Sequence, residues 1–216
     1  MKLVRILKRE RYVLLLATQL AFISILPFLE VSAISTGIFI TSGLSLVLIV
    51  ATNAIGGSRY KKRASLGIAG IFILLSIITS IEELPKFYML TFFLFFILLV
   101  TVVWDIVSML IFSKEIKLEF IAGAIAGYLL MAVCFAFFCV SFAIFNDNIL
   151  TTPASELGFN GILYYSLVTM TTIGYGDISP VDPIVRMAAA MTGVISQFYM
   201  AVVVAVIVGK LMNKRA

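Results

Sequence analysis

The sequence contains no histidine, and charged residues make up only 12% of its 216 positions. Cysteine is nearly absent as well: Cys134 and Cys139 lie five positions apart in one apolar run, where helical geometry directs them to different faces. These absences argue against a catalytic metal site and against a disulfide framework. We therefore expect the two thiols to be buried and to behave as small hydrophobic groups.

Hydrophobic residues make up 62% of the chain, and its mean hydropathy is +1.15. These values are far above those of a soluble domain of this length. Because a helix needs about 20 apolar residues to cross the hydrocarbon core, the length allows about six or seven crossings. The composition predicts an all-α membrane protein with almost no room for a soluble regulatory domain.

Six apolar runs are long enough to span a bilayer as helices. They cover residues 12–29, 33–55, 64–81, 87–112, 118–145 and 184–209. Between the fifth and sixth runs, the semi-polar segment 158–171 is too short to span and suits a re-entrant helix.

The basic residues indicate the orientation, because Lys and Arg near span ends stay on the cytoplasmic side. With six crossings, all but two of the 16 fall on one side, the exceptions being Lys86 and Arg186. This distribution predicts a multi-pass protein of the cell membrane with both termini cytoplasmic. Residues 1–33 allow an alternative, because a basic start, an apolar run and Val31-Ser32-Ala33 resemble a cleavable signal peptide.

The opposite side collects acidic residues, namely Glu30, Glu82, Glu83, Asp147, Glu156, Asp177 and Asp182. A negative field at this face would raise the local concentration of cations. The alternative is that these side chains only solvate the outer loops.

The stretch Thr169-Met170-Thr171-Thr172-Ile173-Gly174-Tyr175-Gly176-Asp177 follows the short helix candidate and precedes the last span. A dehydrated potassium ion needs a ring of oxygens, which stacked backbone carbonyls from several subunits can supply. Turning successive carbonyls to one side requires backbone angles that glycine adopts readily, so we expect a positive φ at Gly174. Irregular backbone at membrane depth is tolerated where it lines a water-filled cavity, so this segment is predicted to face a pore.

A glycine-containing outer turn is the alternative for GYGD alone, but the spacing and the flanking spans favour a pore. Residues 116–211 resemble the pore module of the potassium channel family, and residues 167–172 resemble its voltage-gated branch. The resemblance implies six transmembrane helices plus a re-entrant pore helix and a selectivity filter. It also implies a homotetramer in membrane lipid that is not an enzyme and binds neither nucleic acid nor an organic cofactor.

By this resemblance the selectivity filter consists of Thr172, Ile173, Gly174, Tyr175 and Gly176, of which the first four bind K⁺. The residues implied to support the filter are Asp177, Tyr165, Thr169 and Thr171. Asp177 is expected to hydrogen-bond to Tyr165, at a position where the family often has tryptophan. Ile173 replaces the usual valine, and this change removes no coordinating carbonyl.

The last span contains the candidate hinge and gate. Ungapped alignment with the family places Ser196 at the position of the hinge glycine, and Gly193 lies one turn earlier. The same register directs Val204, Val208 and Met212 toward the pore axis, at the i, i+4, i+8 spacing of one helical face. Packing of this stripe against the fifth span or against lipid is the alternative.

Residues 1–113 are expected to form a four-helix bundle that resembles a voltage-sensor domain, and residues 114–216 the pore domain. The fourth span departs from the voltage-gated pattern, because 89–112 contains no basic residue and Asp105 is its only charge. Gating charges do work of about 2.3 kcal/mol per charge per 100 mV, so a bundle without them cannot be a steep sensor. Asp105 either snorkels toward the cytoplasmic interface or acts as a buried sensing group.

The sequence therefore favours a potassium-selective channel subunit that is not steeply voltage-gated. Two alternatives remain, a non-conducting modulatory subunit and a weakly selective cation channel. The intact glycines and Tyr175 argue against both.

Overall fold

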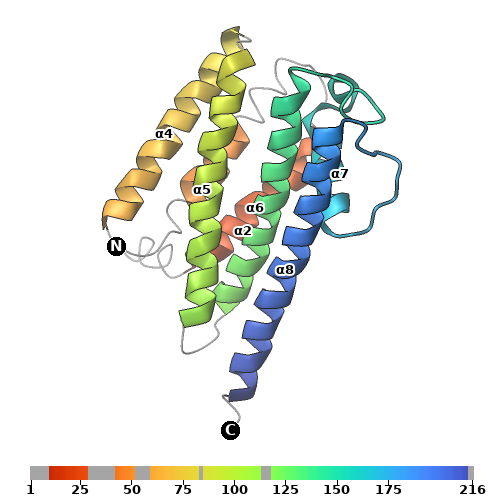
Figure 1. Cartoon of the computed structure of the whole chain (residues 1–216). Coiled ribbons are helices and arrows are strands. Elements are labelled where there is room, and N and C mark those ends of the chain that lie inside the picture. Colours follow the sequence, from red (N-terminus) through yellow and green to blue (C-terminus); the bar gives the residue numbers. More distant parts are fainter. Residues whose placement is uncertain (1–9, 29–41, 52–58, 83–84, 113–117, 214–216) are drawn as a thin grey trace.

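A computed structural model describes residues 10–28, 42–51, 59–82, 85–112 and 118–213. These residues form helices and connecting loops, and no strand occurs among them. Figure 1 shows the long helices side by side, with the short helix α7 beside α8. The elements are α2 (Arg11–Ile25), η1 (Leu26–Phe28), α4 (Arg59–Glu82), α5 (Pro85–Phe112), α6 (Leu118–Ala143), α7 (Ala154–Met170) and α8 (Pro183–Asn213).

Four stretches in these helices are long and apolar enough to cross a membrane: Arg11–Phe28, Met89–Met109, Leu118–Ala143 and Pro183–Lys210. They coincide with the first, fourth, fifth and sixth runs predicted from the sequence. The third run lies in α4, where the apolar stretch Arg63–Leu75 is shorter. Of the second run, the structure describes the short apolar helix Ser42–Ala51. The chain is therefore a helical membrane protein, and a count of six crossings remains a prediction.

Helix α6 is the central element of the packing, because α2, α5, α7 and α8 all contact it. Phenylalanine rings fill much of the interior between α4, α5 and α6. The ring of Phe95 on α5 lies 5.7 Å from Phe72 on α4 and 5.4 Å from Phe137 on α6, measured between centroids. On the other side of α6, Phe135 contacts Tyr165 of α7 at 5.8 Å. Aromatic contacts thus continue from the first helices to α7.

The two predicted domains, 1–113 and 114–216, share one continuous hydrophobic core. Both α2 and α5 pack along α6, across the predicted boundary. The division into a sensor-like bundle and a pore domain therefore remains a prediction about function.

Charged residues meet where α2 and α6 begin. Arg11 Nε lies 3.8 Å from Glu119 Oε1, and the guanidinium stacks over the Tyr12 ring at 4.8 Å from its centroid. Asp105 of α5 is half-buried and lies within electrostatic range of Tyr12. Since Arg11 and Glu119 stand at helix ends, Asp105 lies near this end of the bundle, and both interpretations of its role remain predictions. At this same end Lys210 Nζ donates to Ile111 O at 2.8 Å, which satisfies a terminal carbonyl of α5.

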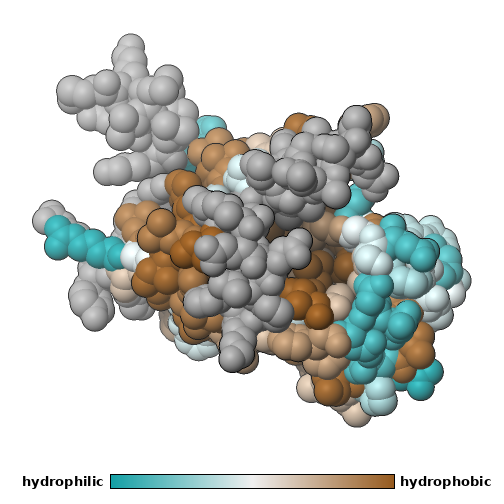
Figure 2. Space-filling view, turned by 90° about the horizontal axis from the view of Figure 1, so that it is seen from above, coloured by the Kyte–Doolittle hydropathy of each residue, from teal (hydrophilic) through white to brown (hydrophobic). Residues whose placement is uncertain are grey.

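Helix α7 is interrupted at Gly158, whose backbone has φ 58° and ψ −174°. Residues 159–170 continue as regular helix, close to the predicted re-entrant segment 158–171. Twelve helical residues extend about 18 Å, which is too short to cross the hydrocarbon core. Figure 2 shows the molecule from the end where the loops around α7 lie. Hydrophilic side chains gather on the side that α7 occupies in Figure 1.

Candidate functional site

The C-terminal end of α7 is fixed between α6 and α8. The carbonyl of Met170 accepts a hydrogen bond from Tyr128 Oη of α6 at 2.7 Å. Ser196 Oγ of α8 lies 2.9 Å from the same carbonyl and 2.8 Å from Gly193 O, and it can donate its hydrogen to either. Two helices therefore position the point at which the chain leaves α7.

A second tyrosine joins α8 to α6 nearby. Tyr199 Oη donates to Ala124 O at 2.8 Å, and its ring lies 6.2 Å from that of Tyr128. A Cβ added at Gly127 would lie 2.5 Å from Tyr199 Oη, so this hydrogen bond requires glycine there. The packing of α6 and α8 thus depends on a close approach that only Gly127 permits.

The segment after α7, residues 171–177, pairs in no sheet and is here called the strand. It turns its first N–H groups back toward the helix. Thr172 N donates to Thr169 O at 3.1 Å, and the N–H groups of Ile173 and Gly174 both donate to Val168 O, at 3.1 and 3.3 Å. In a trans peptide the C=O of one residue points opposite to the N–H of the next. No cis peptide occurs among the described residues. The carbonyls of Thr172 and Ile173 therefore point away from α7, into open space.

The sign of φ alternates along this strand. Thr172, Gly174 and Gly176 have φ values of 59°, 57° and 81°, whereas Ile173 and Tyr175 stay in the ordinary negative range. Alternation of this kind lets successive carbonyls face one direction instead of alternating sides. The positive φ predicted for Gly174 is confirmed. Thr172 is a β-branched residue at positive φ, a strain of about 1–3 kcal/mol that sites of function often carry.

Asp177 closes the strand by accepting a hydrogen bond from a tyrosine of α7. Tyr164 Oη donates to Asp177 Oδ2 at 2.7 Å, and this bond lowers the pKa of the Asp177 carboxyl below its ordinary value. The prediction that Tyr165 makes this bond was wrong. Neighbouring residues on a helix point about 100° apart, and Tyr165 is turned inward against Phe135. Its buried hydroxyl has no hydrogen-bond partner within the described part of the chain.

The other two predicted supporting residues act at the end of α7. Thr171 Oγ1 donates to Leu167 O at 2.7 Å, which satisfies a carbonyl of the last turn. Thr169 accepts the N–H of Thr172 through its backbone carbonyl. Thr171 therefore stabilises the last turn of α7, and Thr169 connects that turn to the strand.

Loop contacts hold the chain just after the strand, at the end remote from α7. Thr151 N donates to Ser179 O at 2.9 Å, Val181 N donates to Ile149 O at 2.8 Å, and Leu150 pairs with Pro180 in an antiparallel bridge. The strand is thus anchored at both ends.

Two of the acidic residues assigned to the outer face also act at helix starts. Asp147 Oδ1 accepts from Ser155 N at 2.8 Å, and Asp182 Oδ1 accepts from Ile184 N at 2.8 Å. Each satisfies an N–H that a helix start leaves unpaired, which sequence analysis missed although Asp is a common N-cap. Glu30 and Glu83 lie outside the described residues.

The candidate gate residues lie on an uncovered part of α8. Val204, Val208 and Met212 are all exposed, and Gly193 has no atom within 4 Å of an added Cβ apart from its own helix and neighbours. Ser196, the predicted hinge, is buried and bonded as described above, so bending here would disturb its bond to Met170 O.

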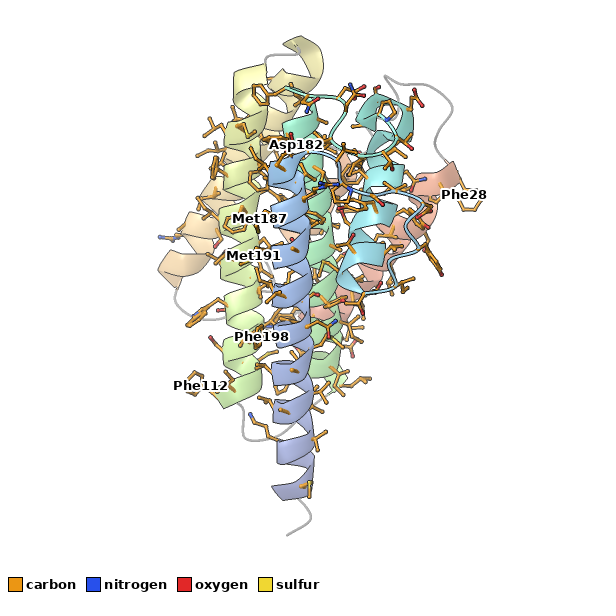
Figure 3. All side chains as sticks on the ribbon, turned by 45° about the vertical axis from the view of Figure 1, so that its right-hand side comes forward. Phe28, Phe112, Asp182, Met187, Met191 and Phe198 are labelled. Carbon is orange, nitrogen blue, oxygen red and sulfur yellow. The ribbon has the colours of Figure 1, made fainter. Side chains whose placement is uncertain are left out.

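Little of the chain covers the strand or α8. Residues 171–177 are exposed along their whole length, and only 17% of the apolar stretch of α8 is buried. On the side labelled in Figure 3, Met187, Met191 and Phe198 project outward one after another along α8. Exposed apolar patches of this extent mark surfaces that contact other molecules.

A family model described as ion channel matches residues 121–213. The matched segment contains most of α6, all of α7, the strand and α8. No curated protein and no solved structure matches the chain. The match supports an ion channel family, and it coincides with the part of the chain that holds the strand.

Proposed function

We propose that this protein is a subunit of a potassium-selective channel in the cell membrane. The observation that carries the proposal is the strand Thr172–Gly176, in which φ alternates and the first carbonyls point away from α7. Rings of such carbonyls from several subunits replace the hydration shell of K⁺. In this proposal K⁺ binds at Thr172, Ile173, Gly174 and Tyr175, with Gly176 completing the filter and no organic cofactor.

Conduction through this strand requires several chains around one axis. One chain offers one strand, and rings of carbonyls form when identical strands surround a closed symmetry axis. The uncovered strand and α8 provide the surfaces for such an assembly. We therefore propose a homotetramer in which α7 directs its C-terminus, with its partial negative charge, toward the central cavity.

The proposed topology has six spans with both termini cytoplasmic, and Val204, Val208 and Met212 lie toward the cytoplasmic end of the pore. No basic residue lies between Met89 and Phe112 of α5, so the first helices supply little gating charge. Opening is proposed to respond to something other than a charged fourth helix.

Ion flux into liposomes tests the proposal. Purified protein, reconstituted in vesicles with a potassium gradient, should carry potassium current and very little sodium current. Gly174→Ala should abolish the flux, whereas Gly70→Ala, at a glycine of α4 without positive φ and with no atom within 4 Å of an added Cβ apart from its own helix and neighbours, should retain it. Equal potassium and sodium flux would indicate a weakly selective channel, and no flux from folded tetramers would indicate a modulatory subunit.

A further inference from the structure

One exposed amide interrupts the apolar surface of α8. A groove on this helix is lined by Gln197, Met200, Ala201, Val204, Ala205 and Val208. Gln197 is exposed, and it is the one polar member of this lining. It lies within Pro183–Lys210, a stretch that is apolar and long enough to cross a membrane.

The level of Gln197 follows from its neighbour. Ser196 is bonded to Met170 O, and Thr171 and Thr172 follow Met170 directly. Gln197 therefore lies at the height of the inner end of the strand. Positions 197, 201, 204 and 208 follow i, i+4, i+7 and i+11, the spacing of one helical face. Gln197 thus lies on the same face of α8 as the candidate gate residues Val204 and Val208, and these positions together form one stripe.

The cost of an unpaired amide decides what this stripe faces. Transfer of an amide to hydrocarbon without a compensating hydrogen bond is strongly unfavourable. Within the described part of the chain, the Gln197 side chain has no hydrogen-bond partner. Polar side chains in membrane spans face the protein interior or a water-filled cavity, so this stripe should face water or another subunit's polar groups.

Another face of α8 has the opposite character. There Ala188, Met191 and Ile195, with Thr192 as the one polar member from α8, line a largely apolar groove together with residues of α5 and α6. Hydrocarbon or apolar side chains can cover this groove without loss. The two faces of α8 are therefore distinguished by chemistry, and the Gln197 face is the one suited to a pore.

We propose that Gln197 lines the inner vestibule directly below the filter, where it helps to hydrate cations as they enter from the cytoplasm. This inference rests on the proposed function and adds a specificity-determining residue to it. In a tetramer four amides would surround the axis. They offer oxygen atoms without net charge, so a vestibule of this kind hydrates cations and concentrates them only weakly. A carboxylate at the same position would attract cations strongly, most of all divalent ones.

The test uses bilayer recordings of the full chain with Gln197→Glu and Gln197→Cys. The first variant should show block by internal Mg²⁺ at least tenfold stronger than in the wild type. The second should lose current when a positively charged, membrane-impermeant thiol reagent is added from the cytoplasmic side. Met191→Cys, on the apolar groove, is the matched control and should keep its current. Native Cys134 and Cys139 are buried, so the wild type should be insensitive to the reagent.

The outcomes separate this inference from the proposed function. Unchanged Mg²⁺ block in Gln197→Glu together with unmodified Gln197→Cys, in channels that still select potassium, would overturn the placement of Gln197 alone. Reaction at Met191→Cys but not at Gln197→Cys would reverse the assignment of the two faces. Absence of potassium-selective current in the wild type would instead overturn the proposed function.

Discussion

Helices α6 and α8 have nearly the same apolar character, with hydropathies of 2.3 and 2.1 for their candidate spans, but very different surroundings. The chain buries 56% of the α6 span and 17% of the α8 span. Helix α6 is thus enclosed by its own chain, whereas α8 and the adjoining strand 171–177 are left bare. The difference indicates that α6 holds the fold of the chain together, whereas α8 and the strand have surface available for contacts outside it.

The largest effect is expected in the bare region. Gly174→Ala should abolish potassium current, because an L-residue at φ 57° is strained and the Ile173 and Gly174 carbonyls would turn away from their direction. Membrane insertion and subunit folding should stay unchanged, since nothing lies within 4 Å of an added Cβ. Current recordings and thermal unfolding in detergent check the two parts. A variant that conducts normally would mean that the strand is not the filter.

In the enclosed region around α6, the expected effect of a substitution is a loss of stability. Gly127→Ala should lower the free energy of unfolding by about 1–3 kcal/mol, because its Cβ would displace Tyr199 Oη from Ala124 O. Gly193→Ala, on α8, is the matched control and should have little effect on the subunit. If unfolding experiments showed equal losses of free energy for the two variants, the proposed difference between α6 and α8 would be contradicted.

A smaller effect is expected where the two regions meet, at the bond from Tyr164 to Asp177. This bond lowers the pKa of the carboxyl, so its support of the strand is present above the ordinary carboxyl pKa. The support is lost as the outer pH falls through the lowered pKa. Tyr164→Phe removes this bond and should raise that pKa toward its ordinary value. The support that remains, from backbone N–H groups bonded to the ionised carboxylate, should then be lost at a higher pH, so conductance should begin to fall at a higher pH than in the wild type.

Recordings across acidic outer pH values measure the shift. Tyr165→Phe is the control, because its hydroxyl has no contact with Asp177, and its pH midpoint should equal that of the wild type. A shift in Tyr165→Phe and none in Tyr164→Phe would contradict the assignment.

The smallest effect concerns α5, which packs against α6. With no basic residue from Met89 to Phe112, open probability should depend only weakly on membrane potential. Any remaining dependence should change when rubidium replaces potassium, because it would arise from ion occupancy of the filter. The slope of the conductance–voltage curve measures this, and an effective charge like that of arginine-rich channels would contradict it.

The sequence predicted the backbone best where a residue type is typical of one conformation, as glycine is of positive φ. Gly174 predicted a positive φ, and the short helix before it was located within a few residues. Thr172 shares this backbone conformation, but its side chain gives no sign of it, because threonine ordinarily avoids positive φ. The hydrogen bonds of Thr172, Ile173 and Gly174 to the end of α7, not the residue type, impose that conformation.

Packing decided what the sequence left open. Tyr164 and Tyr165 are chemically identical neighbours, and only the contact with Phe135 determines which of them turns away from Asp177. Likewise, the hydropathy of α6 and α8 could not tell which helix the chain would enclose. That depends on which helices pack around each one, and therefore on tertiary structure.

The central claim is that the bare strand selects potassium. Its most direct test is the reversal potential of the purified protein in a planar bilayer, with potassium on one side progressively replaced by sodium. We predict that the reversal potential follows the potassium gradient, by about 59 mV for each tenfold change in potassium concentration. A reversal potential that stays near zero as sodium replaces potassium would contradict the claim.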